Sequence, residues 1–285
     1  MLDSLSKVIS TADFEDPEIQ EIIAEMYRHA WPEHAHTHWT GIPVVFDTKR
    51  WEHALAVAAL RRHGALRDDS ILLGVGAGTE VTSFYLARFA RLVLASDIYL
   101  DSGPWKDVAP PEMLMDASTL SPFPVDRRSI LGVHLDARAM NLPDDFVDGI
   151  FSSGSIEYFG GFEQVAAAAS EIGRVLKPGG VASIATTFRL AGPGDVVSWG
   201  IETMLFTEAD LRRHIIDSSG CELVGELLTE VDSDTLATRN QTVGFLGPIG
   251  RAGTLNARLK WCPNLVLAHQ GFVFCTVNIV LRKPL

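Results

Sequence analysis

The stretch from Ile71 to Asp97 restricts the possible folds of this chain more than any other part of the sequence. An apolar run leads into a glycine-rich turn, apolar residues then recur at helical spacing, and a second apolar run ends on Asp97. Thr79, directly after the last glycine, is a residue type that favours the N-cap of a helix. This order of strand, turn, helix and strand predicts a βαβ unit within a parallel α/β sheet.

The turn itself, Gly74-Val75-Gly76-Ala77-Gly78, indicates a ligand-binding loop. Glycine lets a ligand contact the backbone where a Cβ atom would block it. A carboxylate that ends the second strand, here Asp97, can accept hydrogen bonds from a ribose diol. The dinucleotide fingerprint requires a glycine at its sixth position, where this sequence has Thr79 or Val81, depending on the register. That mismatch argues against a nicotinamide-dependent oxidoreductase, which we keep as an alternative.

Further motifs indicate a family. The G-x-G-x-G turn, with Asp97 nineteen residues after Gly78, resembles the first two motifs of the class I S-adenosylmethionine (SAM)-dependent methyltransferases. Three later segments also resemble motifs of this family: Asp136-Ala137, residues 142–148 (LPDDFVD) and residues 176–180 (LKPGG). The resemblance is close over residues 70–188, and residues 153–161 (SGSIEYFGG) are similar to a subgroup found with bacterial glycan-assembly and natural-product genes.

The resemblance implies SAM as the cofactor, with Asp97 on the ribose hydroxyls and Asp136 near the adenine amine. It places further cofactor-binding residues in the same group of loops: Gly74, Gly76, Ala77, Gly78, Glu80, Ile98, Ala137, Ser152 and Ser153. The chain departs from the family pattern in three places. The acidic residue usual in the first strand is Leu72 or Gly74, a later loop glycine is Glu80, and the histidine of the subgroup is Tyr158. Two roles are open for the Glu80 carboxylate. It is favoured at the N-terminus of a helix by the exposed backbone N–H groups, or it contacts the positively charged amino-acid end of SAM.

The order of elements predicts an α/β fold: a Rossmann-like, doubly wound sheet of seven strands with an N-terminal helical cap. Its last strand, Phe272–Leu281, is expected to lie antiparallel beside the strand Val181–Thr187. Within a single methyltransferase domain we distinguish the cap (1–66), a SAM-binding core (67–188) and a substrate-side insert with the terminal strands (189–285). The remaining elements are predicted from periodicity and caps: helices from Asp16-Pro17 onward, over 48–63, 163–176 and 207–218, and strands over 130–135, 149–152 and 221–228.

Catalytic candidates follow from the chemistry of the cofactor. A methyl group on a sulfonium is already electrophilic, so an enzyme mainly positions the acceptor, and an oxygen or nitrogen acceptor can also need a base. Glu157, just beyond the predicted fourth strand, is the first candidate for that base; alternatively its carboxylate orients a backbone or cofactor group. His36 and His38, in a run of alternate histidines, are weaker candidates, with a plain surface loop as their alternative. No cysteine or carboxylate completes a metal-ligand pattern beside them, so we predict no metal site.

Composition limits the partners and the compartment. A net charge of −12, with basic residues only in pairs, opposes binding to phosphate backbones, so nucleic acid is not expected. No apolar run approaches the ~20 residues of a membrane helix. Three widely spaced cysteines indicate reduced thiols in a cytoplasmic protein. We expect an enzyme of the methyltransferase class (EC 2.1.1), acting on a small-molecule hydroxyl of a sugar, phenol or polyketide-like compound. A homodimer and a non-catalytic SAM-binding protein stay open.

Overall fold

The structure is a computed structural model that describes residues 2–27, 48–101, 103, 105, 107–198, 201–241 and 265–285. The candidate bases His36 and His38 lie outside the described residues, and so does the histidine run that contains them.

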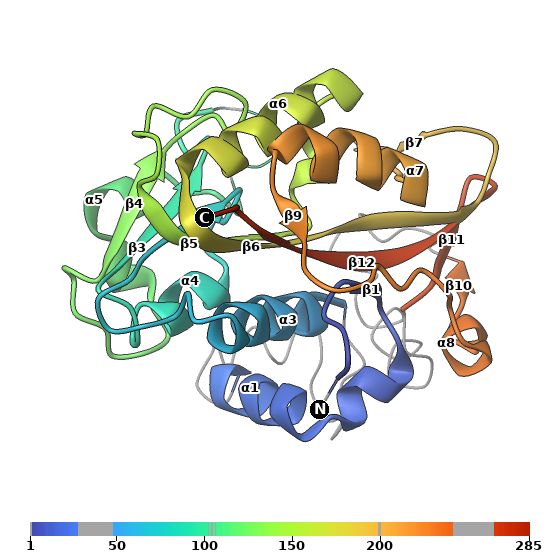
Figure 1. The fold of residues 1–285 in the computed structure, drawn as a ribbon, viewed down its shortest axis with the longest axis horizontal. Helices are drawn as coiled ribbons and strands as arrows, with labels where there is room; N and C mark the ends of the chain where they lie inside the picture. Colours follow the sequence, from blue (N-terminus) through green and yellow to red (C-terminus); the bar gives the residue numbers. More distant parts are fainter. Residues whose placement is uncertain are drawn as a thin grey trace.

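A ten-stranded sheet runs through the molecule with strand order β10-β11-β12-β6-β5-β2-β3-β4 and with β1 and β9 also pairing to β12 (Figure 1). Its core is five strands in parallel register: β2 (Ile71–Val75), β3 (Leu92–Asp97), β4 (Ile130–His134), β5 (Val147–Ser153) and β6 (Leu176–Ala191). The last strand, β12 (Phe272–Arg282), lies antiparallel beside β6, with Ile279 opposite Ile184. The predicted Rossmann-like class and the antiparallel last strand are therefore confirmed.

The sheet has more strands than the predicted seven because several two- and three-residue strands add to it. These are β1 (Lys7–Val8), β9 (Glu222–Leu223), β10 (Asn240–Gln241) and β11 (Leu267–His269). The predicted strand 221–228 shortens to β9, since Gly225 takes a positive φ of 75° and turns the chain away from the ladder. Two further strands, β7 (Val196–Ser198) and β8 (Glu202–Met204), form a separate hairpin.

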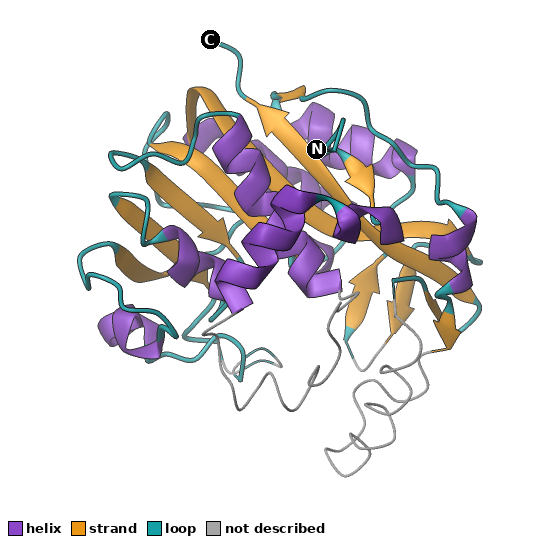
Figure 2. Cartoon of the chain, turned by 90° about the horizontal axis from the view of Figure 1, so that it is seen from below, coloured by secondary structure: helices purple, strands orange, loops and turns teal. Residues whose placement is uncertain are grey.

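Helices cover both faces of the sheet. In Figure 1, α1 (Pro17–Tyr27), α3 (Thr48–Arg62) and α4 (Val81–Leu86) lie below the sheet, whereas α6 (Phe162–Val175) and α7 (Glu208–Leu211) lie above it. Seen from below, α1 and α3 cross in front of the strands (Figure 2). The remaining helical segments are short: α5 (Met113–Asp116), α8 (Ser233–Ala237), the 3-10 turns η1 (Thr11–Glu15), η2 (Ala117–Leu120) and η3 (Ile156–Tyr158), and the π-helical continuation of α7, η4 (Arg212–Asp217).

The N-terminal helices form because their caps and apolar residues match their positions. Asp16 caps α1, since its Oδ1 accepts the backbone N–H groups of Glu18 (2.9 Å) and Ile19 (3.3 Å). Every residue of α3 from Trp51 to Leu60 is buried, because the helix packs on β5, β6 and β12 on one side and against α1 on the other. The α3 helix is therefore an inner layer, and the two polar residues buried within it, Glu52 and His53, require partners.

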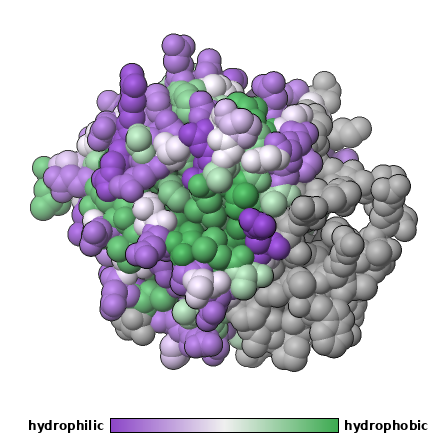
Figure 3. Space-filling model, turned by 90° about the vertical axis from the view of Figure 1, so that its right-hand side faces the viewer, coloured by the Kyte–Doolittle hydropathy of each residue, from purple (hydrophilic) through white to green (hydrophobic). Residues whose placement is uncertain are grey.

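A second, small apolar cluster packs the β7–β8 hairpin against the far end of β12. It contains Val197, Leu205, Phe272 and Phe274, with Leu267 packed against them. Figure 3 views this end of the molecule, where apolar side chains gather near the centre of the face.

Candidate functional site

The loops that carry the sequence-predicted site residues meet at one edge of the sheet. Because β2, β3, β4 and β5 are parallel, their carboxyl ends point to the same side, which is where ligands bind in open α/β sheets. The structure thus brings together the glycine turn, Asp97, Ser152, Ser153 and Glu157.

The glycine turn is held by contacts from two neighbouring loops. Gly76 and Gly78 adopt positive φ values of 62° and 44°, which favour glycine. A Cβ atom on Gly76 would lie 2.5 Å from Ser155 Oγ, and one on Gly78 would overlap the carbonyl oxygen of Val108. We expected a ligand to be what excludes side chains here; in the structure, protein atoms already occupy those two positions.

The helix after the turn begins one residue later than predicted. Its N-cap is Glu80, which makes no capping hydrogen bond with its side chain, so the prediction that Thr79 caps the helix is wrong. Both the backbone N–H (3.0 Å) and the Oγ1 (3.3 Å) of Thr79 donate to the carbonyl oxygen of Val108. The hydroxyl is therefore used to hold the loop 107–109 against the turn.

Asp97 lies at the end of β3 and connects that strand to the glycine turn. Its Oδ2 accepts the N–H of Gly78 at 2.8 Å, and its Oδ1 accepts the N–H of Ile98 at 2.7 Å. Burial raises the pKa of this carboxyl, although the two N–H groups act to lower it. Tyr99 supports the arrangement from below, since its hydroxyl donates to the carbonyl oxygen of Gly78 at 2.8 Å. The carboxylate is thus fixed beside the turn with acceptor capacity remaining on both oxygens.

Asp136 follows β4 and is paired with Arg138. The guanidinium donates to both carboxylate oxygens at 2.8–3.2 Å, and the backbone N–H of Arg138 donates to Oδ1 at 2.9 Å. These contacts lower the pKa of the half-exposed Asp136 carboxyl. Ala137 is buried directly after it. A ligand contact by Asp136 would therefore share a carboxylate that is already held in place by an arginine.

The serines that end β5 join it to the glycine turn. Ser152 Oγ lies 2.8 Å from Ser155 Oγ, which in turn donates to the carbonyl oxygen of Val75 at 3.0 Å. Ser153 Oγ is buried and has no hydrogen-bond partner among the described residues. Such an atom at a strand end is a place where a bound group can be recognised.

Glu157 is buried just beyond β5. Its Oε2 accepts a hydrogen bond from Thr186 Oγ1 at 3.0 Å. Burial raises the pKa of this carboxyl to about 7, against the lowering effect of the Lys49 ammonium and with a further raising effect from Glu52. At neutral pH the group is therefore close to half ionised, which is the condition that suits a general base.

Two charged residues of α3 that the sequence did not single out, the half-exposed Lys49 and the buried Glu52, lie beside Glu157. Lys49 Nζ donates to Glu52 Oε2 at 2.8 Å and to the carbonyl oxygen of Ser153 at 2.6 Å. Burial acts to lower the pKa of Lys49, but the carboxylates of Glu52, Glu80 and Glu157 outweigh it, so the pKa is raised. The signal in the sequence is a glutamate and a histidine between Trp51 and Ala54, in a helix that is otherwise apolar on its inner face.

Gly154 makes room for this group. It has a positive φ of 68°, and a Cβ atom there would overlap Lys49 Nζ and lie 3.2 Å from Glu52 Oε2 and 3.4 Å from Glu157 Oε1. The three charged groups therefore converge on one glycine at the carboxyl end of β5.

Trp105 and Tyr158 form an aromatic pair. The rings of Trp105 and Tyr158 are 4.6 Å apart between centroids, with an angle of 58° between their planes. Trp105 precedes the loop that holds Thr79, and Tyr158 follows Glu157. The pair thus places aromatic rings close to the candidate base.

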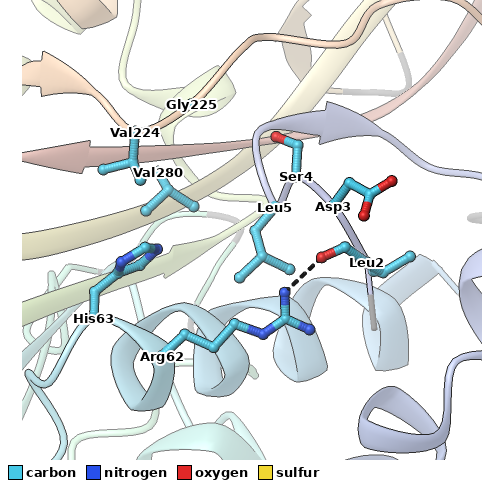
Figure 4. A pocket seen from close by; sticks show the side chains of 9 residues that line it. All are labelled: Leu2, Asp3, Ser4, Leu5, Arg62, His63, Val224, Gly225 and Val280. Carbon is cyan, nitrogen blue, oxygen red and sulfur yellow. Dashed lines mark hydrogen bonds between the residues drawn. The ribbon is translucent and has the colours of Figure 1, made fainter.

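A cavity of about 390 Å³ opens at the opposite end of α3 (Figure 4). It is lined by the N-terminal segment, by Arg62 at the end of α3 and His63 directly after it, and by residues of the β9–β12 region. Arg62 donates to the carbonyl oxygen of Leu2 at 2.8 Å. Arg62 lies thirteen positions after Lys49 in the same helix, which corresponds to roughly 20 Å. The cavity is therefore separate from the strand-end site.

Within the ranges that the structure describes, no group of three or more His, Cys, Asp or Glu side chains could hold a metal ion. The helices in those ranges are too short or too polar to cross a lipid bilayer.

Comparison with known proteins finds a match for the parallel core. Residues 73–184 match the protein-family model described as a methyltransferase domain. A structure of a putative sarcosine dimethylglycine methyltransferase from Galdieria sulphuraria is similar at a TM-score of 0.51 and 15% identity, covering 88% of this chain and 97% of that one. The structure of the [4+2]-cyclase SpnF is similar at a TM-score of 0.50 and 18% identity, covering 82% of this chain and 83% of that one. The YcgJ protein from Bacillus subtilis is similar at a TM-score of 0.50 and 13% identity, covering 81% of this chain and 98% of that one.

These structural similarities show the fold alone, because the identities are low and unrelated activities recur on one fold. No curated protein matches the sequence.

Proposed function

We propose that this chain, whose residues 73–184 match a methyltransferase domain, is a class I SAM-dependent methyltransferase that transfers a methyl group to a hydroxyl of a small molecule. SAM is the cofactor of this family. The proposal adds the acceptor class and the residues that serve the reaction.

The polar groups of the strand-end site suit SAM. The half-buried Asp97 carboxylate beside the glycine turn suits a ribose diol. Ser153 Oγ, at the end of β5, is buried and has no hydrogen-bond partner among the described residues. We therefore assign the cofactor to the loops that contain Gly74–Gly78, Glu80, Asp97-Ile98, Asp136-Ala137 and Ser152-Ser153.

When bound, SAM supplies an electrophilic methyl group on its sulfonium. The protein then has to orient the acceptor and remove its proton, because a neutral hydroxyl is a weak nucleophile. Glu157 is the residue that we assign to accept that proton. The observation that carries this assignment is its buried carboxyl with a pKa of about 7 at the carboxyl end of β5. A carboxylate with an ordinary pKa would be a weaker base toward a hydroxyl.

The acceptor is expected to be small and weakly polar. The Trp105–Tyr158 pair can pack against a sugar, phenol or polyketide-like ring next to Glu157. A net charge of −12 disfavours a polyanionic acceptor. Nucleic acid is therefore not a proposed substrate.

A labelled-methyl assay tests the proposal. The purified protein is incubated with SAM carrying a labelled methyl group and a panel of hydroxylated sugars, phenols and polyketide-like compounds. We expect transfer to at least one compound, with kcat reduced about 100-fold or more in Glu157→Gln, the range of a lost general base. Glu163→Gln, on the exposed start of α6, serves as the matched control and should keep full activity.

Two other results would contradict the proposal. Salt-sensitive methylation of total RNA, with no transfer to any hydroxyl compound, would remove the small-molecule assignment. Tight SAM binding without transfer to any acceptor would favour the non-catalytic SAM-binding protein.

A further inference from the structure

The cavity at the end of α3 has walls that hydrogen bonds hold in place. Ser4 Oγ donates to the carbonyl oxygen of Glu226 at 3.0 Å, and Ser6 Oγ donates to that of Val224 at 3.0 Å. The backbone N–H of Val224 donates in turn to the carbonyl oxygen of Val280 in β12 at 2.8 Å. The cavity of about 390 Å³ is therefore built into the fold, and it falls at the small end of the size range of small-molecule sites.

Apolar side chains form one part of the cavity wall. Leu5 and Val280 are buried core residues, and Val224 is partly buried and packs against the same core. In Figure 4 these three side chains gather around the space that the His63 ring also faces. A wall of this kind suits the hydrocarbon part of a small ligand.

Basic side chains form another part of the wall. The guanidinium of Arg62 donates to the carbonyl oxygen of Leu2 and to the carboxylate of Glu18, which uses three of its five N–H groups. The imidazole of His63, the next residue, makes no hydrogen bond or ion pair within the described part of the chain. Asp3 also lines the cavity, but in Figure 4 its carboxylate points away from the His63 ring. Donor capacity is therefore left on both basic side chains.

Arg282 adds a third positive charge to this part of the cavity. It follows Val280 by two positions in β12, and alternate residues of a strand point to the same face of a sheet. Its cross-strand neighbour is Glu222, with which it forms no ion pair within the described ranges. Burial lowers the pKa of His63, and the charges of Arg282 and Arg62 lower it further, with no carboxylate of the described residues acting against them. The surroundings of His63 are thus electropositive in a protein of net charge −12.

We propose that this cavity is a second ligand site, which binds a small organic carboxylate. Arg62 and His63 hold the carboxylate group in the positive field of Arg282, and the hydrocarbon part of the ligand packs on Leu5 and Val224. Inorganic phosphate fits less well, because it would leave the apolar part of the wall unused. The proposal does not depend on SAM at the strand ends, since the two sites lie at opposite ends of α3.

Three probes test the two parts of the wall separately. Octanoate has an apolar chain and a carboxylate, 1-octanol has the same chain without the charge, and inorganic phosphate has charge without the chain. Each is titrated into the full chain by calorimetry and by NMR of the histidine rings. We expect octanoate to bind at one site per chain, about tenfold or more tightly than either of the other probes. The His63 ring signal, identified by its loss in His63→Leu, should shift as octanoate binds.

Variants locate the site. His63→Leu removes a donor and Val224→Phe fills the cavity, so each should weaken octanoate binding about tenfold or more. His214→Leu, which removes a histidine stacked on Phe162 of α6, is the matched control and should leave that affinity unchanged. S-adenosylhomocysteine, the cofactor product, should not displace octanoate. If Val224→Phe fails to fold, as judged from its thermal unfolding, the half-exposed His63 and the ring signal of the parent protein decide the question.

Several results would overturn the proposal. Octanoate that shows no saturable binding, or that binds no more tightly than octanol or phosphate, would remove the assignment of the ligand class. An unchanged octanoate affinity in His63→Leu, an unshifted His63 ring signal, or displacement of octanoate by S-adenosylhomocysteine would place the binding elsewhere.

Discussion

Replacing Lys49 by methionine should move the ionisation of Glu157 and, with it, the pH dependence of catalysis. The position of a Gly154 Cβ atom would be in contact with both Lys49 Nζ and Glu157 Oε1. The two atoms are therefore at most about 6 Å apart, and at that distance, with an effective dielectric constant of about 20, the ammonium favours the carboxylate by about 3 kcal/mol. The Lys49 side chain is 49% exposed, so solvent screens part of this energy. We therefore expect a change of about tenfold in the acid dissociation constant of Glu157.

The assay is the pH profile of kcat/KM in the labelled-methyl reaction. The acid limb of the parent should have its midpoint near pH 7, the pKa of Glu157. In Lys49→Met the carboxyl stays protonated to higher pH, so activity should fall about fivefold at pH 7 and be nearly equal to the parent at pH 9. Lys49→Arg keeps the charge and should keep the acid limb. Lys177→Met, which removes a lysine paired with Asp148 away from the site, is the control. A Lys49→Met profile that is lowered by the same factor at every pH would refute the reasoning.

Two further variants test the packing of the site. Glu157→Gln should gain stability relative to the parent as the pH rises from 5 to 8, by up to about 3 kcal/mol in the free energy of unfolding. The reason is that the Glu157 carboxyl, with a pKa raised to about 7 in the folded protein, favours folding at low pH, and this contribution is lost as the pH rises through that value. Denaturant unfolding of both proteins at several pH values measures the effect. The prediction is contradicted if the free energies of unfolding of the two proteins change in parallel with pH. Gly78→Ala places a side chain at a residue with a φ of 44°, against the Val108 carbonyl oxygen, so it should lower the free energy of unfolding by about 1–3 kcal/mol. A Cβ atom on Gly194 would meet nothing within 4 Å, so Gly194→Ala should leave the free energy of unfolding nearly unchanged. Equal stabilities of these two alanine variants would show that the loop around Val108 does not hold the turn.

Local signals in the sequence were sufficient for the parallel core. The unit from β2 to β3 was predictable because its strand, glycine turn and helix signals lie within 27 consecutive residues, Ile71 to Asp97. The antiparallel β12 followed from the order of elements. The short strands β1 and β9 were not predictable at their observed length, because two residues carry no period, and their pairing with β12 depends on residues far away in the sequence.

The candidate site divides in the same way. The glycine turn and Asp97 were expected at the strand ends, and the structure places them there. The sequence analysis missed Lys49, Glu52 and His53 because their position over the strand ends depends on tertiary packing. The α3 helix precedes the parallel strands in the chain and reaches the site only by packing across them. Polar residues within a buried helix were the available signal, and their meaning depended on knowing which end of the sheet the helix crosses. The cofactor-binding and catalytic roles of all these residues, and the division into cap, core and insert, remain predictions.

Calorimetric titration of the cofactor product tests the central claim most directly. The account predicts that the parent binds S-adenosylhomocysteine with one site per chain and binds it more tightly than NAD. Asp97→Ala should weaken that binding about tenfold or more, since it removes charge-assisted hydrogen bonds to the ribose. Asp126→Ala, which removes an exposed aspartate paired with Arg128, should leave it unchanged. Tighter binding of NAD by the parent, or an unchanged affinity for S-adenosylhomocysteine in Asp97→Ala, would contradict the assignment of this edge of the sheet as the SAM site.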